Sequence, residues 1–564
     1  AARELYRCGF DVSIFEASDR IGGRLYTRDN PNNNAFPAME MGAMRMPFFI
    51  ESGSVQNPEQ QNSLLGYYLN SETRSILADF PNPGQAPDGT GVYINRGLGP
   101  ENNFPKPELI PWPKGGQPEN PQLQIVSKAA AAFQENFVAV VQPLYVSATD
   151  QWEAVWGKMT AFYDNYTFGD IVTMPAKSLP EMQAAVQDPN FDGDLGGFGM
   201  TEEQSSLLYT IGTGDGSWGA FYDISALWFM RCTFFGFDSH LQTVEGLADT
   251  QQLPSYGAPA VDANGFPIPA PYFQGIQSLV EYLYFVAAPG AAKSLHEAGT
   301  LRLNTKVFAM NKRSDGKIDV YRVTGAKTYV EIYDYVIVTA SQWASQLSMA
   351  AQGFPESELP QAKITAQHTQ HNISSCKLFF PLTQPYWKPG VSSVPQIIVT
   401  DTYIQDVYGL EWGSRDGAIL LASYTWEDDA NKLLPFDEAA LTETVLGKLR
   451  EITLETTGED ITRFVDASKP VMIQWIQQPT YIGCAKLYRS GNQAENMLDL
   501  GYNQNYAGAS HLYFAGENYG VEGGWTEPAL RSALDAVMQL LNHSGARFSS
   551  PDFNFDQDYP RWPS

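Results

Sequence analysis

HLYFAGENYGVEGGWTEPALRSALDA, residues 511–536 of this 564-residue chain, is the stretch that decides the fold. Its apolar beginning, Leu512 to Ala515, predicts a short strand, and the glycines that follow predict a turn. Pro528 stands where the first turn of a helix tolerates a missing N–H group, so a helix is expected next. The unpaired N–H groups of that helix favour an anionic ligand, which the glycines let approach the backbone. A plain strand-to-helix connection has the same pattern, and both readings stay open at this point.

The composition predicts a folded, soluble protein of roughly two or three domains. Hydrophobic residues make up 43% of the chain and aromatic residues 13%, and no apolar run of about 18 residues predicts a membrane-spanning helix. The formal net charge of -27 argues against nucleic acid or an anionic membrane surface as a partner. The four cysteines and six histidines are scattered, so neither a disulfide framework nor a metal site is expected. The compartment, cytoplasmic or secreted, stays open.

The chain begins inside a nucleotide-binding pattern. Residues 1–10 predict the second half of a helix, and DVSIFEAS predicts a strand that carries Glu16 at its end. In a dinucleotide-binding unit such a strand follows a Gly-x-Gly-x-x-Gly turn, and its acidic end residue binds ribose hydroxyls. We expect this glycine turn upstream of residue 1, in a precursor or on a separate short chain.

Two nearby segments carry further candidate residues. In DRIGGR the glycines let the backbone approach a ligand, and Arg24 can neutralise a phosphate. In MEMGAMRMPFF, Arg45 stands alone among apolar residues, beside Gly42 and Ala43. Its guanidinium fits the capture of a substrate carboxylate and an internal ion pair equally well.

The middle of the chain predicts helices and then sheets. Residues 120–235 have mainly helical spacing of apolar residues, which indicates an inserted domain. GDGSWG at 214–219 matches the glycine motif only formally, because no strand precedes it. The aromatic residues that follow, Phe221 among them, fit a pocket wall or an ordinary core. Strands are expected at 301–310 and 329–339, and a mainly antiparallel second sheet within 370–480.

Five segments of the chain resemble the flavin amine oxidase family in order and spacing. They are EASDRIGGR, EMGAMR, SSCKLFF, LLASYTWEDDANKLL and GENYGVEGGWTEPAL. Within the family, the chain is similar to the branch of bacterial L-amino acid oxidases and monooxygenases, and GAMR and SYTWEDD are the most specific signals. The resemblance covers almost the whole chain and is loose from about residue 50 to residue 200.

The resemblance implies an α/β fold with α+β elements. A Rossmann-like FAD-binding domain would be interleaved with a mixed-sheet substrate-binding domain and accompanied by a helical domain. The expected boundaries are 1–50, 260–345 and 484–545 for the FAD-binding domain, 51–119 and 346–483 for the substrate-binding domain, and 120–259 for the helical domain.

The resemblance also implies residues that bind the FAD cofactor. Glu16 would bind the adenosine ribose, and Arg24 would lie on the pyrophosphate side. Glu517 would face the second ribityl or phosphate portion. The other implied cofactor contacts are Gly42, Ala43, Met44, Val307, Trp525 and Thr526.

For the substrate, the resemblance implies a carboxylate clamp made by Arg45 with help from Tyr408. Lys377 would hold a water near flavin N5, whereas the residues alone fit a surface cation at the start of a strand. The Gly523 carbonyl would contact the substrate amine. The remaining pocket residues would be Phe221, Trp475 and Trp525.

The implied reaction is oxidative deamination of an L-amino acid by FAD and dioxygen, giving a 2-oxo acid, ammonia and hydrogen peroxide. The aromatic residues favour an apolar or aromatic substrate side chain, whereas Asp215 and Asp223 keep a basic amino acid such as lysine open. A decarboxylating monooxygenase that produces an amide and an inactive flavin-fold binding protein are the alternatives. A homodimer is also expected.

Overall fold

The strand, turn and helix expected at 511–536 form as β21 (Leu512–Phe514), a 3-10 turn (Glu517–Tyr519) and α16 (Thr526–His543). Gly516 joins the strand to the turn with a φ of 113°, a backbone conformation that residues with a Cβ atom rarely adopt. The computed structural model describes residues 1–28, 37–47, 63–95, 107–147, 149–212, 219–236, 241–248, 274–412, 417–491, 493–501 and 510–559.

Two short pairs of parallel strands follow, and β21 of the second pair packs against α16. β1 (Ile14–Phe15) pairs with β8 (Leu301–Arg302), and β12 (Val336–Val338) pairs with β21. Helix α1 (Ala2–Arg7) precedes β1, as expected for the second half of a nucleotide-binding unit. Leu5 of α1 shares a small core with β21 and α16, so the N-terminal and C-terminal segments pack together.

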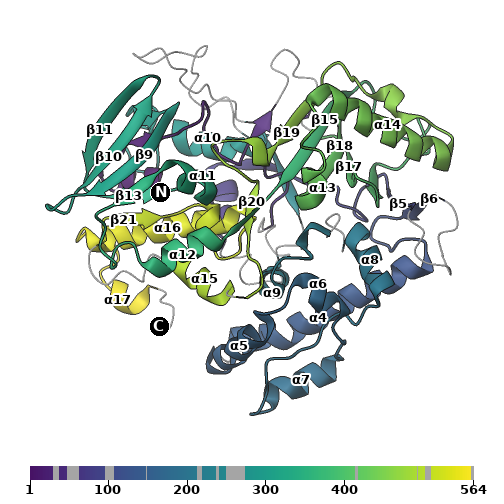
Figure 1. Cartoon of the computed structure of the whole chain (residues 1–564), viewed down its shortest axis with the longest axis horizontal. Helices are drawn as coiled ribbons and strands as arrows, with labels where there is room; N and C mark the ends of the chain where they lie inside the picture. The colour runs from purple at the N-terminus through teal and green to yellow at the C-terminus, as the bar shows by residue number, and fades with distance from the viewer. Residues whose placement is uncertain are drawn as a thin grey trace.

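A four-stranded sheet with the order β11-β10-β9-β13 continues this part of the molecule (Figure 1). β10 alternates buried and half-buried side chains along its length, which is typical of a sheet with one face on the core. The prediction of strands at 301–310 and 329–339 is confirmed in outline. The bounds are β9 (Thr305–Lys312), β10 (Ile318–Thr324), β11 (Lys327–Tyr333) and β13 (Ala350–Gln352).

A seven-stranded sheet with the order β19-β15-β18-β17-β16-β5-β6 forms a second layer, covered on one side by α14 (Glu438–Thr457) (Figure 1). Every neighbouring pair is antiparallel except β16 and β5, which confirms the mainly antiparallel sheet predicted within 370–480. The bounds are β5 (Thr90–Ile94), β6 (Glu108–Trp112), β15 (Ser375–Leu382), β16 (Ile397–Thr400), β17 (Asp406–Leu410), β18 (Ala418–Trp426) and β19 (Val471–Gln474).

The helices predicted within 120–235 also form. They share one apolar core, and α9 lies toward the centre of the molecule (Figure 1). Three of them begin with capping boxes, at Thr167, Ser178 and Thr201, in which side chain and backbone satisfy each other's terminal groups. The bounds are α4 (Pro121–Ser147), α5 (Thr149–Tyr163), α6 (Phe168–Thr173), α7 (Leu179–Gln187), α8 (Glu202–Ile211) and α9 (Ala226–Phe235).

Short elements connect these layers. β4 (Ser75–Asp79) pairs with β7 (Gln242–Leu247), which joins segments assigned from the sequence to different domains. The domain boundaries therefore stay predictions. The other elements are β2 (Thr27–Arg28), β3 (Met39–Glu40), α3 (Leu64–Gly66), a π-helical turn (Tyr67–Glu72), α10 (Gln277–Phe285), α11 (Gln342–Ser348), α12 (Gln361–Thr369), β14 (His371–Ile373), α13 (Glu427–Asn431), β20 (Ala485–Leu487), α15 (Gln493–Gly501), α17 (Phe555–Asp558), and 3-10 turns at Gly219–Phe221, Ile461–Phe464 and Trp475–Gln477.

Among the described residues, every helix is too short or too polar to cross a lipid bilayer. Nearly all of the formal glycine match at 214–219, including Asp215, lies outside the described residues.

Candidate active site

A cavity of about 1380 Å³ lies where the N-terminal segment, the two parallel strand pairs, β15 and the start of α16 meet. Its wall contains most of the residues singled out from the sequence. Tyr408 and Gly523 are not among its lining residues. Those that line it are Glu16, Arg24, Gly42, Ala43, Met44, Arg45, Phe221, Val307, Lys377, Trp475, Glu517, Trp525 and Thr526.

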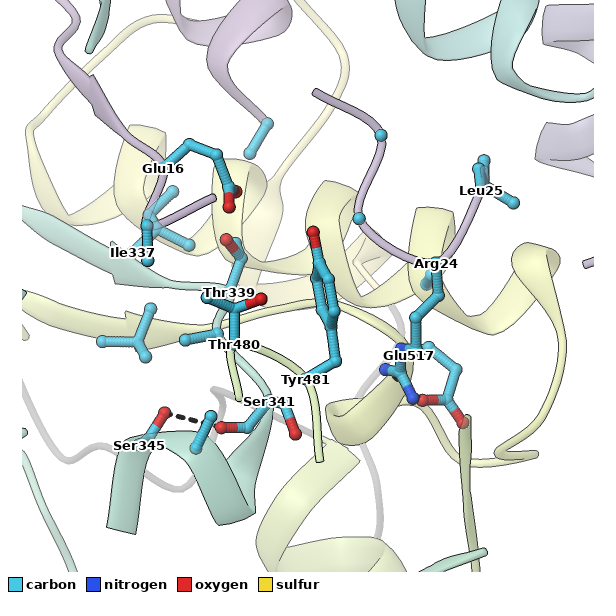
Figure 2. Close-up of a pocket in the computed structure, with 18 of the residues that line it drawn as sticks. Glu16, Arg24, Leu25, Ile337, Thr339, Ser341, Ser345, Thr480, Tyr481 and Glu517 are labelled. Atoms are coloured by element: carbon cyan, nitrogen blue, oxygen red, sulfur yellow. Dashed lines mark hydrogen bonds and ion pairs between the residues drawn. The ribbon is translucent and has the colours of Figure 1, made fainter. Parts of the chain in front are cut away.

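Glu16 lines the cavity directly after β1. Its Oε1 accepts hydrogen bonds from the backbone N–H (2.8 Å) and the hydroxyl (2.6 Å) of Ser18, and the Tyr481 hydroxyl lies 3.2 Å from that same Ser18 hydroxyl. Figure 2 shows Glu16, Thr339 and Tyr481 projecting into the same space. This part of the cavity wall therefore presents a fixed carboxylate and several hydroxyls, groups that pair with the hydroxyls of a ribose.

Arg24 and Glu517 form an ion pair on the other side of this space, with 2.6 Å between Arg24 Nη2 and Glu517 Oε2 (Figure 2). Arg24 Nη1 also donates to the Cys484 carbonyl at 3.1 Å. Glu517 Oε1 accepts from the backbone N–H groups of Lys486 (2.8 Å) and Gly524 (2.6 Å). The pair thus joins the N-terminal segment to β20 and to the turn that precedes α16.

Gly42 begins the wall next to this pair, and no larger residue fits there. A Cβ at Gly42 would lie 1.9 Å from the Arg24 carbonyl oxygen, well inside van der Waals contact. Trp475 packs behind the same turn, and its indole N–H donates to the Met41 carbonyl at 2.9 Å. Gly42 and Ala43 both line the cavity, and Gly42 does so without a side chain.

Lys377 lies beneath this turn and is 1% exposed, so it is not a surface cation. Its Nζ donates to the carbonyls of Glu40 (2.9 Å) and Gly42 (2.6 Å) and lies 4.7 Å from the ring centroid of Tyr424. Burial lowers the pKa of Lys377 to about 7, although Glu40 opposes this shift. Burial likewise raises the pKa of the Glu40 carboxyl to about 8. Lys377 can therefore gain or lose its proton near neutral pH.

Arg45 enters the cavity from the next residues of the same segment. Its Nη1 donates to Asn82 Oδ1 at 2.5 Å, and its guanidinium carbon lies 5.6 Å from the ring centroid of Phe80. Burial raises the pKa of Tyr424 well above its ordinary value, and the positive charge of Arg45 opposes this. A cation and a tyrosine hydroxyl with these surroundings can bind a carboxylate.

Tyr424 is a site residue that the residue-level prediction missed. It lies opposite Lys377 across β15 and β18, and opposite Asp406 across β18 and β17, so all three share one face of the sheet. All three line the cavity. Tyr408 is fully buried, with its ring centroid 6.5 Å from that of Tyr424. The alternation of AILLASYTW against SSCKLFF is the sequence signal that could have found Tyr424.

Aromatic side chains surround the end of the cavity near Arg45 and Lys377. Phe221 stacks on Trp228, with centroids 5.5 Å apart at an interplanar angle of 27°, and lies 6.1 Å from Trp426. The Trp228 indole N–H donates to the Gly523 carbonyl at 3.1 Å. The aromatic wall residues not singled out from the sequence include Tyr424, Trp426 and Tyr481.

These groups fit a dinucleotide with an aromatic ring system. The fit rests on a carboxylate at a strand end, a cation, bare backbone at Gly42 and the N-terminus of the 18-residue helix α16. No group of three or more His, Cys, Asp and Glu side chains that could hold a metal ion occurs in the described part of the chain.

Comparison with curated proteins finds relatives that span nearly the whole chain. Tryptophan 2-monooxygenase of Rhizobium rhizogenes is 24% identical over 97% of this chain, which spans 65% of that enzyme's length, less than two thirds. The enzyme of the same name from Pantoea agglomerans pv. gypsophilae is 25% identical over 97% of this chain and 87% of its own length. The L-amino-acid oxidase of Mus musculus is 26% identical over 44% of this chain and 37% of its own length.

The fold is similar to that of cyclohexylamine oxidase from Brevibacterium oxydans IH-35A, with a TM-score of 0.58, 13% sequence identity and coverage of 96% of both chains. The family model described as flavin containing amine oxidoreductase matches residues 1–66 and 225–541. These residues carry the strand ends, the turn at Gly42 and the start of α16 that line the cavity. The chain belongs to the flavin-containing amine oxidoreductase family.

Proposed function

We propose that this protein is an FAD-dependent oxidase that deaminates L-amino acids with an apolar or aromatic side chain. The products are the 2-oxo acid, ammonia and hydrogen peroxide. The observation that carries the proposal is the position of Arg45, a guanidinium held by Asn82 at the aromatic end of a cavity that continues to Glu16. A plain amine needs no such cation, whereas an α-amino acid presents a carboxylate to it.

FAD supplies the hydride acceptor when it is bound. Glu16 would hold the adenosine ribose, and Arg24, paired with Glu517, would face the diphosphate. The backbone of Gly42 and the start of α16 would contact the ring system, where the positive end of the helix dipole favours negative charge. Ala43, Met44, Val307, Trp525 and Thr526 complete the proposed cofactor contacts.

Arg45 and Tyr424 would orient the substrate through its carboxylate. Two points of attachment fix the direction of the Cα–H bond, and orientation of this kind supplies a large share of enzymatic rate enhancement. We assign to Tyr424 the part expected of Tyr408, because Tyr424 lines the cavity and Tyr408 does not.

Lys377 would bind a water or a proton beside the reacting carbon. Two of its three possible N–H bonds go to the carbonyls of Glu40 and Gly42, so the amine is held in one place. With a pKa of about 7, it is neutral above that pH and can then accept a hydrogen bond.

Two neighbouring functions have specific support. The curated relatives named tryptophan 2-monooxygenase favour a decarboxylating monooxygenase, whose product would be an amide. Asp406 lines the cavity in the same row as Tyr424 and Lys377, which favours a basic substrate side chain. Asp223, the other acidic residue that could favour a basic side chain, is exposed and does not line the cavity.

The test is an anaerobic visible spectrum of the purified holoenzyme during titration with L-phenylalanine, L-tryptophan and L-lysine in turn, followed by air. We expect L-phenylalanine or L-tryptophan to bleach the flavin band, and 2-oxo acid and peroxide to appear with air. An amide would assign the monooxygenase, and bleaching by L-lysine alone would assign the basic substrate. A flavin band that no L-amino acid bleaches would refute the proposed function. Purified protein without a flavin band would also refute it and would support the inactive binding protein instead.

The homodimer belongs to this proposal as a prediction from the sequence. Light scattering on the holoenzyme tests it.

A further inference from the structure

The turn between the 3-10 segment and α16, residues 520–525, is fixed by two side chains of helix α9. The Trp228 indole N–H donates to the Gly523 carbonyl at 3.1 Å. Arg231 donates to Glu522 Oε1, through Nε at 3.2 Å and through Nη2 in a shorter contact. Trp228 and Arg231 are three residues apart, so they lie on the same face of α9 and hold two consecutive residues of the turn.

Both contacts are buried. Trp228 and Arg231 are each 8% exposed and Glu522 is 3% exposed. Burial raises the pKa of the Glu522 carboxyl, but Arg231 and Arg531 outweigh this effect, and the net shift is downward. Glu522 therefore stays ionised at neutral pH and needs its arginine partner, because an unpaired buried charge is strongly unfavourable.

β20 supports the same turn from another side. A Cβ on Gly523 would lie 2.0 Å from the Lys486 carbonyl oxygen, so the turn rests directly on the main chain of β20. Lys486 Nζ donates to the Gly520 carbonyl, and also to the Tyr488 hydroxyl at 2.6 Å. The turn has little freedom to move while these contacts persist.

The held turn leads directly to the cavity. Gly524, Trp525 and Thr526 follow the anchored residues and line the cavity, while Gly523 does not. Trp228 lines the cavity as well, and its ring stacks on Phe221. One indole therefore contacts the aromatic wall and the segment that begins α16.

We propose that Trp228 and Arg231 are positioning residues, which act through Gly523 and Glu522 to place Gly524, Trp525 and the start of α16 against the flavin. In this role the Gly523 carbonyl accepts the hydrogen bond of the Trp228 indole N–H. Only the amino-acid assay below rests on the proposed function.

The first test separates positioning from wall contact. Trp228→Phe keeps an aromatic ring in the wall and removes the N–H donor. Loss of one hydrogen bond predicts that flavin reduction slows by roughly 2- to 10-fold with L-phenylalanine and equally with the smaller L-methionine. A pure wall role would instead weaken the affinity for L-phenylalanine, leave the reduction rate unchanged, and refute the positioning role.

The second test needs no substrate. Hydrogen exchange of the holoenzyme, followed by mass spectrometry, should show faster exchange in residues 520–526 in Trp228→Phe and Arg231→Gln. The visible circular dichroism of the bound flavin should change in both. Arg3→Gln is the matched control, because Arg3 pairs with Glu72 at 3.1 Å with side chains 7% and 9% exposed, and neither residue lines the cavity.

Exchange in 520–526 that stays at the wild-type rate in Trp228→Phe would overturn the inference, as would an equal increase in Arg3→Gln. If Arg231→Gln does not fold, Trp228→Phe alone decides. If no L-amino acid reduces the flavin, the proposed function fails, while the exchange and dichroism results still test the positioning role.

Discussion

Removal of the Arg45 guanidinium is the most direct test of the proposed substrate orientation. Arg45 is half-buried, and its Nη1 donates to Asn82 Oδ1 at 2.5 Å. Because this contact already orders the guanidinium, binding of a carboxylate costs little side-chain entropy. Truncation of one member of a desolvated charged pair costs about 2 to 5 kcal/mol. At about 1.4 kcal/mol per factor of ten, Arg45→Ala should weaken binding of an aromatic L-amino acid by about 30- to 4000-fold.

A two-by-two comparison isolates the carboxylate. Wild type and Arg45→Ala are each titrated anaerobically with L-phenylalanine and with 2-phenylethylamine, which has the same ring and amine but no carboxylate. We expect Arg45→Ala to weaken binding of L-phenylalanine by the stated factor and binding of 2-phenylethylamine by less than about 3-fold. Only the amino acid carries the carboxylate that pairs with Arg45, so the coupling energy is lost for that ligand alone. Arg45→Lys keeps the positive charge but lacks the planar guanidinium, so its affinity for L-phenylalanine should lie between those of the wild type and Arg45→Ala. Equal weakening of both ligands, or of neither, would refute carboxylate capture by Arg45.

Three further outcomes are expected. Lys377→Met should keep FAD but slow flavin reduction. Because Lys377 is charged below its pKa of about 7 and neutral above it, the rate of flavin reduction in the wild type should rise with pH through about 7. Stopped-flow measurements across this pH range should show that the rise is lost in the variant. Gly42→Ala should abolish or strongly weaken FAD retention, because its Cβ would lie 1.9 Å from the Arg24 carbonyl oxygen. The ratio of flavin to protein absorbance measures the retention. Normal retention would contradict the close packing at Gly42. Tyr424→Phe should raise the dissociation constant for L-phenylalanine by roughly 2- to 10-fold in the anaerobic titration, as for one lost hydrogen bond. Tyr408→Phe should leave this constant unchanged. An increase in Tyr408→Phe but not in Tyr424→Phe would instead support Tyr408 as the partner of the substrate carboxylate.

Local patterns predicted most of the elements. The strand, turn and helix at 511–536, the helices of the insertion and the mainly antiparallel sheet all follow from apolar periodicity and glycine or proline positions, which act within a few residues. The sequence indicates both Arg45 and Lys377 as candidate site residues, and both line one cavity although 332 positions separate them.

The misplaced details depend on contacts between distant segments. The pairing of β17 with β18 shifts register between Asp406 and Tyr408. Asp406 lines the cavity beside Tyr424, whereas Tyr408 packs in the same apolar cluster as Tyr424 without lining the cavity. A single local shift of this kind is not visible in residue alternation. The Gly523 carbonyl similarly meets Trp228, a residue 295 positions away, and no pattern near Gly523 indicates that partner.

The dual contact of Trp228 has a consequence for the redesign of substrate preference. Phe221 lies between Trp228 on α9 and Trp426 on β18, so the aromatic wall has two supports. Under the proposed roles, a library that varies Trp426 reshapes the pocket and leaves the flavin environment intact. A library that varies Trp228 changes both properties at once, and its members would lose turnover for reasons unrelated to substrate fit. Selection for new substrates should therefore begin at β18.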